Sequence, residues 1–215
     1  MKTVILFFCL GFSCTCLSQG KEFIEGSFVN QKGDTIKGFF QKKYSTSFKD
    51  LKFTQNIAGN IFSAIIIDSC KAVCLENDYY TVWHGKRGMA YIDRFNFEIQ
   101  NIDSFLTETI PLKLLFQGSR LSLYHYYDLT DHFFVGLNDS IQELMISYRY
   151  PTDWEKSKYV RNVPAYEINP IYRYQIIALL NNELSKKQKF LVDRSEYDKY
   201  ALIRLFKKID PIVKK

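Results

Sequence analysis

The stretch VNQKGDTIKGFF, residues 29–40, decides how the fold begins. Apolar side chains lead into it and out of it, and the polar segment 30–34 between them contains Gly33. Glycine adopts positive φ angles at no steric cost, which a tight turn often requires. Two apolar runs around such a segment are typical of a β-hairpin with a loop of about four or five residues. We therefore expect the chain to open with two antiparallel strands.

The following segment continues the pattern of short strands. Eighteen Phe and fifteen Tyr in 215 residues favour sheet, because aromatic side chains fit a half-buried pleated surface. Residues 84–88, His-Gly-Lys-Arg-Gly, are expected to form a loop, and residues 112–116 fit either a helix or a strand. The further predicted strands are 51–54, 61–67, 72–75, 79–83, 89–99, 121–127, 132–137 and 141–148. This spacing predicts an antiparallel β sandwich or an open barrel.

The pattern of apolar and polar residues changes at Pro151. Residues 151–168 have no apolar period and are predicted to form a connecting loop. Asn169-Pro170 then resembles a helix start, and Ser195 is expected to open a second helix whose apolar face ends at Ile209. The predicted fold class is α+β, with a β-rich domain over 19–150 and a C-terminal helical hairpin over 169–215 packed on it.

The first residues, 1–18, are predicted to be a signal peptide. Lys2 precedes the apolar run 4–10, and Cys16 and Ser18 occupy the −3 and −1 positions of a cut before Gln19. Cleavage there predicts an exported protein of the periplasm or the outer-membrane periphery. Lipid anchoring through Cys14 or Cys16 is the alternative, although neither cysteine follows a good lipobox. No second apolar run is long enough to span a membrane as a helix, so no membrane span is predicted in the mature chain.

Only two cysteines lie outside this leader, Cys70 and Cys74. Export permits a disulfide between them, and their spacing allows one across a turn or a single helical turn. In an extended strand the two would lie about 13 Å apart, which is beyond bridging distance. A disulfide and two free thiols both remain open.

The histidines offer the one arrangement that resembles a metal site. If residues 128–131 form a hairpin loop, Tyr127 lies opposite His132, and His125 and His132 share one face of the sheet. A metal site at these two histidines is the weaker alternative, and two ordinary hairpin histidines are the favoured one. We predict neither a metal nor a cofactor.

No catalytic motif is found in the sequence. There is no G-x-S-x-G, no Cys-His signature and no phosphate-binding glycine loop. Carboxylates could act as the acid/base pair of a glycosidase, but nothing in the sequence selects two of them. The candidates by position are Asp93, Glu98, Asp103 and Glu108.

Several stretches together resemble a known family. They are Gly26-Ser27-Phe28-Val29, Gly33-Asp34-Thr35-Ile36-Lys37-Gly38, Leu115-Phe116-Gln117-Gly118, Leu121-Ser122-Leu123-Tyr124, His132-Phe133-Phe134-Val135 and Tyr200-Ala201-Leu202-Ile203-Arg204-Leu205-Phe206. In this order they resemble secreted envelope proteins of Bacteroidota, in which a Gly-Asp-Thr hairpin opens a β-rich domain. The resemblance implies an envelope location and carries no catalytic residue. Asp34-Thr35-Ile36 and Asp139-Ser140-Ile141 also resemble bacterial O-glycosylation sites, which implies glycans on Thr35 and Ser140.

Together these features predict a non-enzymatic binding or accessory module of the cell envelope. The net charge of +6 suits anionic partners, and the expected partners are an envelope protein, a glycan or an anionic lipid surface rather than a nucleic acid. Trp154, Lys156 and Tyr159 on the loop 151–168 are the predicted contact residues, because loops on a rigid scaffold carry function. The alternatives are a glycan hydrolase with a carboxylate pair and a carrier of a small ligand.

Overall fold

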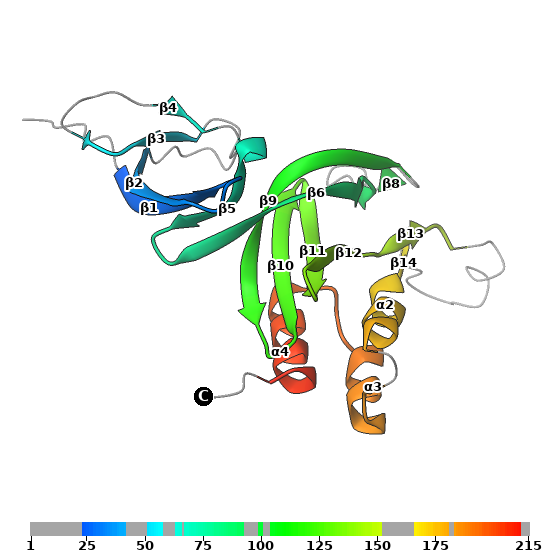
Figure 1. Ribbon diagram of the computed structural model, residues 1–215. Coiled ribbons are helices and arrows are strands. Elements are labelled where there is room, and N and C mark those ends of the chain that lie inside the picture. The colour runs from blue at the N-terminus through cyan, green and yellow to red at the C-terminus, as the bar shows by residue number, and fades with distance from the viewer. Residues whose placement is uncertain are drawn as a thin grey trace, which may run out of the picture.

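The fold is an open, curved antiparallel sheet with three helices against one half of it (Figure 1). A computed structural model describes residues 23–41, 51–57, 63–65, 67–92, 99–100, 104–151, 166–180 and 183–211. Every strand pair in this part of the chain is antiparallel. The predicted α+β class with an antiparallel, unclosed sheet is therefore confirmed.

The opening hairpin forms as the sequence predicts. Strand β1 (Phe23–Asn30) pairs with β2 (Thr35–Gln41), and Val29 lies opposite Thr35. Gly33 has a φ angle of 96°, a conformation that disfavours other residues. The backbone N–H of Asp34 donates to the side-chain oxygen of Asn30 at 2.9 Å, so that asparagine closes the turn from within.

The main sheet has ten strands in the order β12-β11-β10-β9-β6-β5-β1-β2-β3-β4. Its other members are β3 (Lys52–Thr54), β4 (Ser63–Ala64), β5 (Cys70–Leu75), β6 (Asp78–Gly88), β9 (Phe105–Gln117), β10 (Leu121–Asp128), β11 (Thr130–Leu137) and β12 (Ser140–Leu144). Two small pairs accompany it, β7 (Tyr91–Ile92) with β8 (Ile99–Gln100), and β13 (Ser147–Arg149) with β14 (Glu167–Asn169). A 3₁₀ turn, Ile67–Ser69, leads into β5.

The long strands β6 and β9 correct two predictions. The predicted loop 84–88 is the second half of β6, and residues 112–116 are strand rather than helix. The ring of Trp83 occupies the space that a side chain at Gly85 would need, so the glycine allows the aromatic ring to lie along the strand. The predicted strand 89–99 is reduced to the short β7 and the start of β8 in the described residues.

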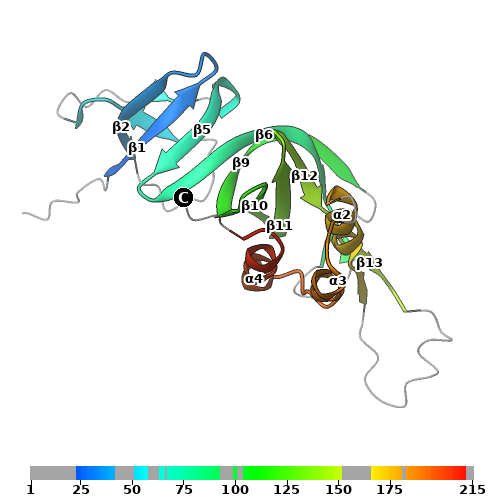
Figure 2. The same ribbon diagram turned by 60° about the horizontal axis from the view of Figure 1, so that its bottom comes forward.

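The curved sheet carries separate hydrophobic clusters. Strands β1 to β5 pack around Phe40 and Val73, and this half projects away from the helices (Figure 2). Around β9 to β12, successive residues face opposite sides of the sheet. Phe133 and Val135 face the helices, whereas Phe134 joins Ile110 and Leu112 on the other face.

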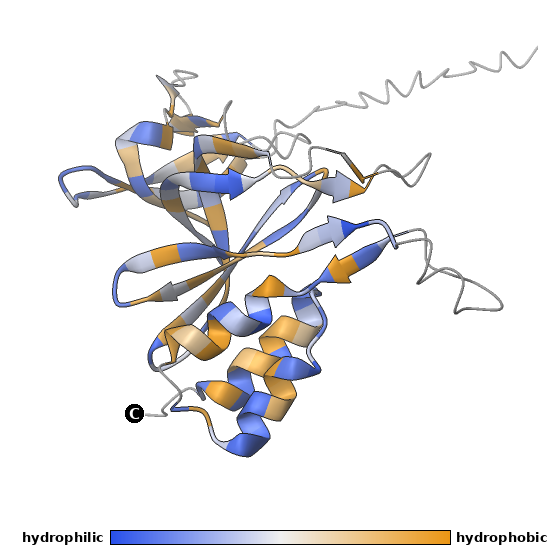
Figure 3. Ribbon diagram, turned by 90° about the vertical axis from the view of Figure 1, so that its right-hand side faces the viewer, coloured by the Kyte–Doolittle hydropathy of each residue, from blue (hydrophilic) through white to orange (hydrophobic). Residues whose placement is uncertain are grey.

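The C-terminal part contains three helices rather than the predicted hairpin of two. They are α2 (Ile171–Leu179), α3 (Lys186–Asp193) and α4 (Lys199–Ile209), and each mixes hydrophobic and hydrophilic residues along its ribbon (Figure 3). The helix α3 was not predicted, although Ser185 and Gln188 form the capping box that starts it. Asp198, not Ser195, caps α4, because its carboxylate accepts the backbone N–H groups of Tyr200 and Ala201.

Strand β12 forms one edge of the main sheet, and helix α2 covers that edge. The amide of Gln175 accepts a hydrogen bond from Met145 N at 2.7 Å and donates one to Glu143 O at 3.0 Å, as a neighbouring strand would. The N–H of Tyr172 donates to Met145 O at 2.7 Å. An edge strand that is paired in this way is protected from pairing with another chain.

Candidate functional site

The structure describes none of the three predicted contact residues. Trp154, Lys156 and Tyr159 lie outside the described residues, as do Asp93, Glu98 and Asp103. Thr35 and Ser140 are both exposed at the first position of a strand after a turn, and O-glycosylation at either stays a prediction. No helix in the described ranges is long and apolar enough to cross a membrane.

Cys70 and Cys74 are free thiols, and the disulfide alternative is wrong for this structure. Both lie on the extended strand β5, opposite Asn30 and Ser27 of β1. Four residues of strand separate the two sulfur atoms by more than a disulfide can span. Burial raises the pKa of the Cys70 thiol and outweighs a hydrogen bond with Ser69, which lowers it. Cys70 is therefore a protonated core residue.

The two hairpin histidines do not share a face. In the structure Tyr126, not Tyr127, lies opposite His132, and His125 lies opposite Phe133. A shift of one residue in register moves a side chain to the other side of a sheet. His125 and His132 therefore do not meet at one site, and no group of three metal-ligating side chains occurs among the described residues.

On its own face of the sheet, His132 belongs to a buried polar network that is centred on Arg87. The guanidinium is 2% exposed, and its Nε donates to Glu108 Oε1 at 2.6 Å. Its Nη2 donates to Asp128 Oδ2 at 2.9 Å, and its Nη1 lies 3.1 Å from His132 Nε2. The ring of Tyr126 lies 5.3 Å from the guanidinium carbon.

The partners of His132 determine its tautomer. A guanidinium can only donate hydrogen bonds, so His132 Nε2 accepts from Arg87. The proton must then be on Nδ1, which donates to Glu143 Oε1 at 2.7 Å. We therefore assign His132 as a neutral imidazole. The second oxygen of Glu143 accepts the backbone N–H of Gly88 at 2.7 Å.

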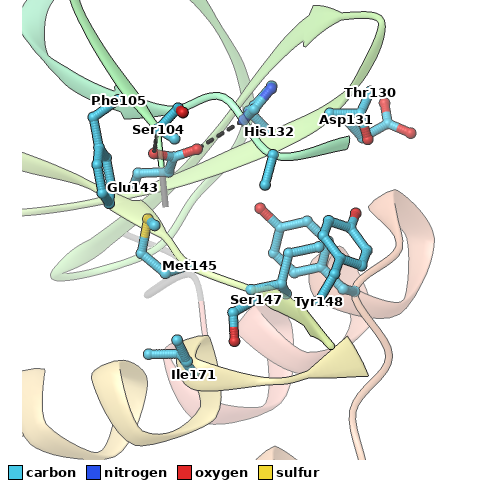
Figure 4. A pocket seen from close by; sticks show the side chains of 14 residues that line it. Ser104, Phe105, Thr130, Asp131, His132, Glu143, Met145, Ser147, Tyr148 and Ile171 are labelled. Atoms are coloured by element: carbon cyan, nitrogen blue, oxygen red, sulfur yellow. Dashed lines mark hydrogen bonds and ion pairs between the residues drawn. The ribbon is translucent and has the colours of Figure 1, made fainter. Parts of the chain in front are cut away.

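A cavity of about 130 Å³ opens beside this pair (Figure 4). It lies where the ends of β6, β9 and β11 meet the β12–β13 connection and the start of α2. Its apolar and aromatic walls are formed by Phe105, Met145, Ile146, Tyr148, Ile171 and Tyr197. His132 and Glu143 form its polar wall, and Asp131 also lines it.

Tyr197 joins the cavity to the helical layer. Its hydroxyl donates to Leu144 O at 2.7 Å and accepts from Phe133 N at 3.2 Å. Burial raises the pKa of this phenol far above its ordinary value. The hydrogen bond from Phe133 N lowers the pKa, but the negative charges of Glu143 and Asp131 raise it further. Tyr197 thus stays protonated and serves as a fixed donor.

The chemistry open to this site is limited by how fully its groups are engaged. His132 Nε2, the atom that a general base would use, is occupied by Arg87. Glu108 and Asp128 are both paired with the same guanidinium. No buried side-chain polar atom in the described part of the chain lacks a hydrogen-bond partner. The titratable groups of the site are therefore engaged with one another.

Sequence reasoning missed Arg87 as a site residue and did not connect Glu108 with Asp128. The glycines on either side of this arginine indicated a loop, and its partners are 21 to 45 residues away along the chain. Phe133 is 0% and Tyr124 is 9% exposed, so both aromatic side chains belong to the core.

Comparisons with known proteins do not add to this description. No protein-family model, no curated protein and no solved structure was found to match the chain.

Proposed function

We propose that this protein is a non-enzymatic binding or accessory module of the cell envelope, and that its cavity receives a group of a partner molecule. The observation that carries the proposal is the cavity itself. It is partly apolar and has a polar wall at His132 and Glu143, at the junction of sheet and helices. Apolar walls with a few oriented polar groups are the usual features of a binding site.

The size of the cavity favours a partner's side chain over a free ligand of drug size. Sites for drug-sized ligands enclose roughly 300–1,000 Å³. This cavity encloses about 130 Å³, close to the ~150 Å³ that holds a single benzene ring in an engineered protein core. At this cavity, a docking module is therefore supported better than a carrier.

The hydrolase alternative gains no support from the described residues. A retaining or inverting glycosidase needs two carboxyl groups that are free to exchange protons. Glu108 and Asp128 are held by Arg87, and Glu143 accepts hydrogen bonds at both oxygens. Tyr197 is held protonated, so it offers no phenolate nucleophile.

Export and an envelope partner rest on the sequence. The predicted leader 1–18 and the resemblance to secreted Bacteroidota proteins support them. The protein is proposed to act in the periplasm or at the outer-membrane periphery, where an envelope protein is the partner that best fits a cavity of side-chain size.

Filling the cavity tests this function. Ala90 lines the cavity, and Ala90→Leu adds three carbon atoms to it. Ala178→Leu makes the same change at an exposed position of α2 and is the matched control. We expect Ala90→Leu to lose partners that wild type and Ala178→Leu both capture from envelope extracts. Equal capture by all three proteins, or glycan hydrolysis by the wild type, would contradict the proposal.

A further inference from the structure

The charge around the cavity is not balanced. The network and the cavity wall together contain four carboxylates, Glu108, Asp128, Asp131 and Glu143. Arg87 is the arginine that forms ion pairs with two of them. The guanidinium contacts Glu108 and Asp128 directly, so its positive charge is already matched by two negative charges.

Glu143 in particular has neutral partners. Its hydrogen bonds come from the backbone N–H of Gly88 and from the neutral imidazole of His132. Its side chain is 6% exposed, and no lysine or arginine of the described residues forms an ion pair with it. A buried carboxylate is costly unless a positive charge accompanies it.

The remaining described lining residues carry no positive charge themselves, and the ammonium of Lys86 lies over the ring of Phe105, 4.5 Å from its centroid. Asp131 on the rim accepts from His125 Nε2 at 2.7 Å, and no lysine or arginine is among the described lining residues. The field of the carboxylates extends to the neighbouring phenol of Tyr126. Burial raises its pKa, and the charges of Glu108 and Asp128 raise it further against the opposing charge of Arg87.

We propose that the cavity receives the primary ammonium of a lysine side chain of the partner, with the alkyl stem against the apolar wall and the charge beside Glu143. This inference rests on the proposed function, since it names the group that the same cavity binds. Met145, Ile171 and Phe105 offer contact to methylene groups. Each Glu143 oxygen has accepted one hydrogen bond and can accept another.

Lysine fits better than arginine for geometric reasons. A guanidinium is bound best by a carboxylate that offers both oxygens in one plane. In Glu143 these directions are partly used by Gly88 N and His132 Nδ1. An ammonium is a compact point charge, so one remaining acceptor direction is enough. Tyr148 and Tyr197 also line the cavity, and aromatic rings attract cations in general.

The test is isothermal titration of the mature chain with small probes of matched shape. Butylamine copies the end of a lysine side chain, butanol is its neutral counterpart, and butyrate has the opposite charge. We expect butylamine to bind at least tenfold more tightly than butanol, and butyrate not to bind. Butylamine binding should weaken with added salt, whereas butanol binding should not. A blocked Gly-Lys-Gly peptide should bind at least as tightly as butylamine.

Two variants assign the preference to its residues. Glu143→Gln removes the charge, and the preference for butylamine over butanol should fall below threefold. Because that change also disturbs two buried hydrogen bonds, Asp131→Asn provides a second variant at an exposed rim position, and a twofold to threefold fall is expected. Glu183→Gln, an exposed glutamate paired with Arg120 away from the cavity, is the control and should leave the preference unchanged.

The outcomes separate this inference from the proposed function. Equal binding of butylamine and butanol, both lost in Ala90→Leu, would overturn the lysine assignment and keep the binding site. Binding of butylamine without binding of the peptide would also overturn it, in favour of a free amine. No binding of any probe or of the peptide, together with unchanged partner capture by Ala90→Leu, would overturn both.

Discussion

Asp210 joins the C-terminal helix α4 to the sheet. We predict that replacing it lowers the free energy of unfolding by a large amount. Its carboxylate lies at the end of α4 and accepts hydrogen bonds from the turn between β9 and β10. Oδ2 accepts from Arg120 N at 2.9 Å and from Leu121 N at 2.6 Å, and Oδ1 accepts from the Ser119 hydroxyl. The residue is 3% exposed.

The magnitude follows from what Asp210→Ala would leave behind. Leu121 is buried, so its N–H would lose its partner without access to water, at a cost of about 1–3 kcal/mol. Ser119 and Arg120 are exposed and can turn to water, which limits their share to about 1 kcal/mol. The sum of about 2–4 kcal/mol corresponds to a fall in Tm of roughly 4–16 °C for a chain of this size.

The pH dependence gives an independent check. Burial alone would raise the pKa of Asp210, but the hydrogen bonds from Ser119, Leu121 and Arg120 and the charge of Arg120 outweigh it and lower the pKa. A carboxyl group with a lowered folded pKa stabilises the fold above its unfolded pKa of ~3.9 and loses this effect as the pH falls through the folded value. The advantage of wild type over Asp210→Asn should therefore be full at pH 6 and shrink below about pH 4.

Urea unfolding followed by far-UV circular dichroism measures both effects. Asp210→Asn keeps an acceptor for the two N–H groups and should lose about 1 kcal/mol at pH 6. Asp193→Ala, an exposed aspartate at the end of α3, is the control and should stay within about 0.5 kcal/mol of wild type. An Asp210→Ala protein with the wild-type urea midpoint would refute the reasoning.

Three further predictions concern the packing and the leader. Leu205→Asp places a carboxylate in the core between α4 and the sheet and should cost more than about 3 kcal/mol, so a wild-type melting temperature would disprove that packing. Gln175→Leu leaves Met145 N and Glu143 O unpaired at the β12 edge. It should lower the urea midpoint and increase self-association in light scattering, and an unchanged monomer of unchanged stability would count against edge protection. The exported protein should begin near Gln19 by mass spectrometry, and an intact Met1 or an acylated cysteine would contradict a cleaved leader.

Elements with strong local signals were predictable from the sequence. The hairpin at residues 29–40 follows from its apolar runs and from Gly33, and both hold in the structure. The strands β10 and β11 were also predicted, but their register was wrong by one residue. The turn between them is tighter than expected because Leu129 adopts a φ angle of 57°, which nothing in a leucine indicates.

The site depended on contacts that no local pattern encodes. Arg87 is buried because partners from β9, β10 and β11 meet it, and its own segment resembles a polar loop. The one-residue register change then decides that His132 faces this arginine and that His125 does not. By contrast, α3 had a readable start in Ser185 and Gln188, and its lysines concealed the apolar face.

The most direct test of the central claim, that the cavity is a binding site, is a methyl NMR titration of the methionines. The sequence has three, and Met1 belongs to the predicted leader, so the mature protein should show two signals. Met145 lines the cavity, whereas Met89 is not among its lining residues and serves as an internal control. On addition of butylamine or the blocked Gly-Lys-Gly peptide, the Met145 signal should move saturably while the Met89 signal stays in place. A Met145 signal that does not respond, or that moves only together with Met89, would contradict the claim.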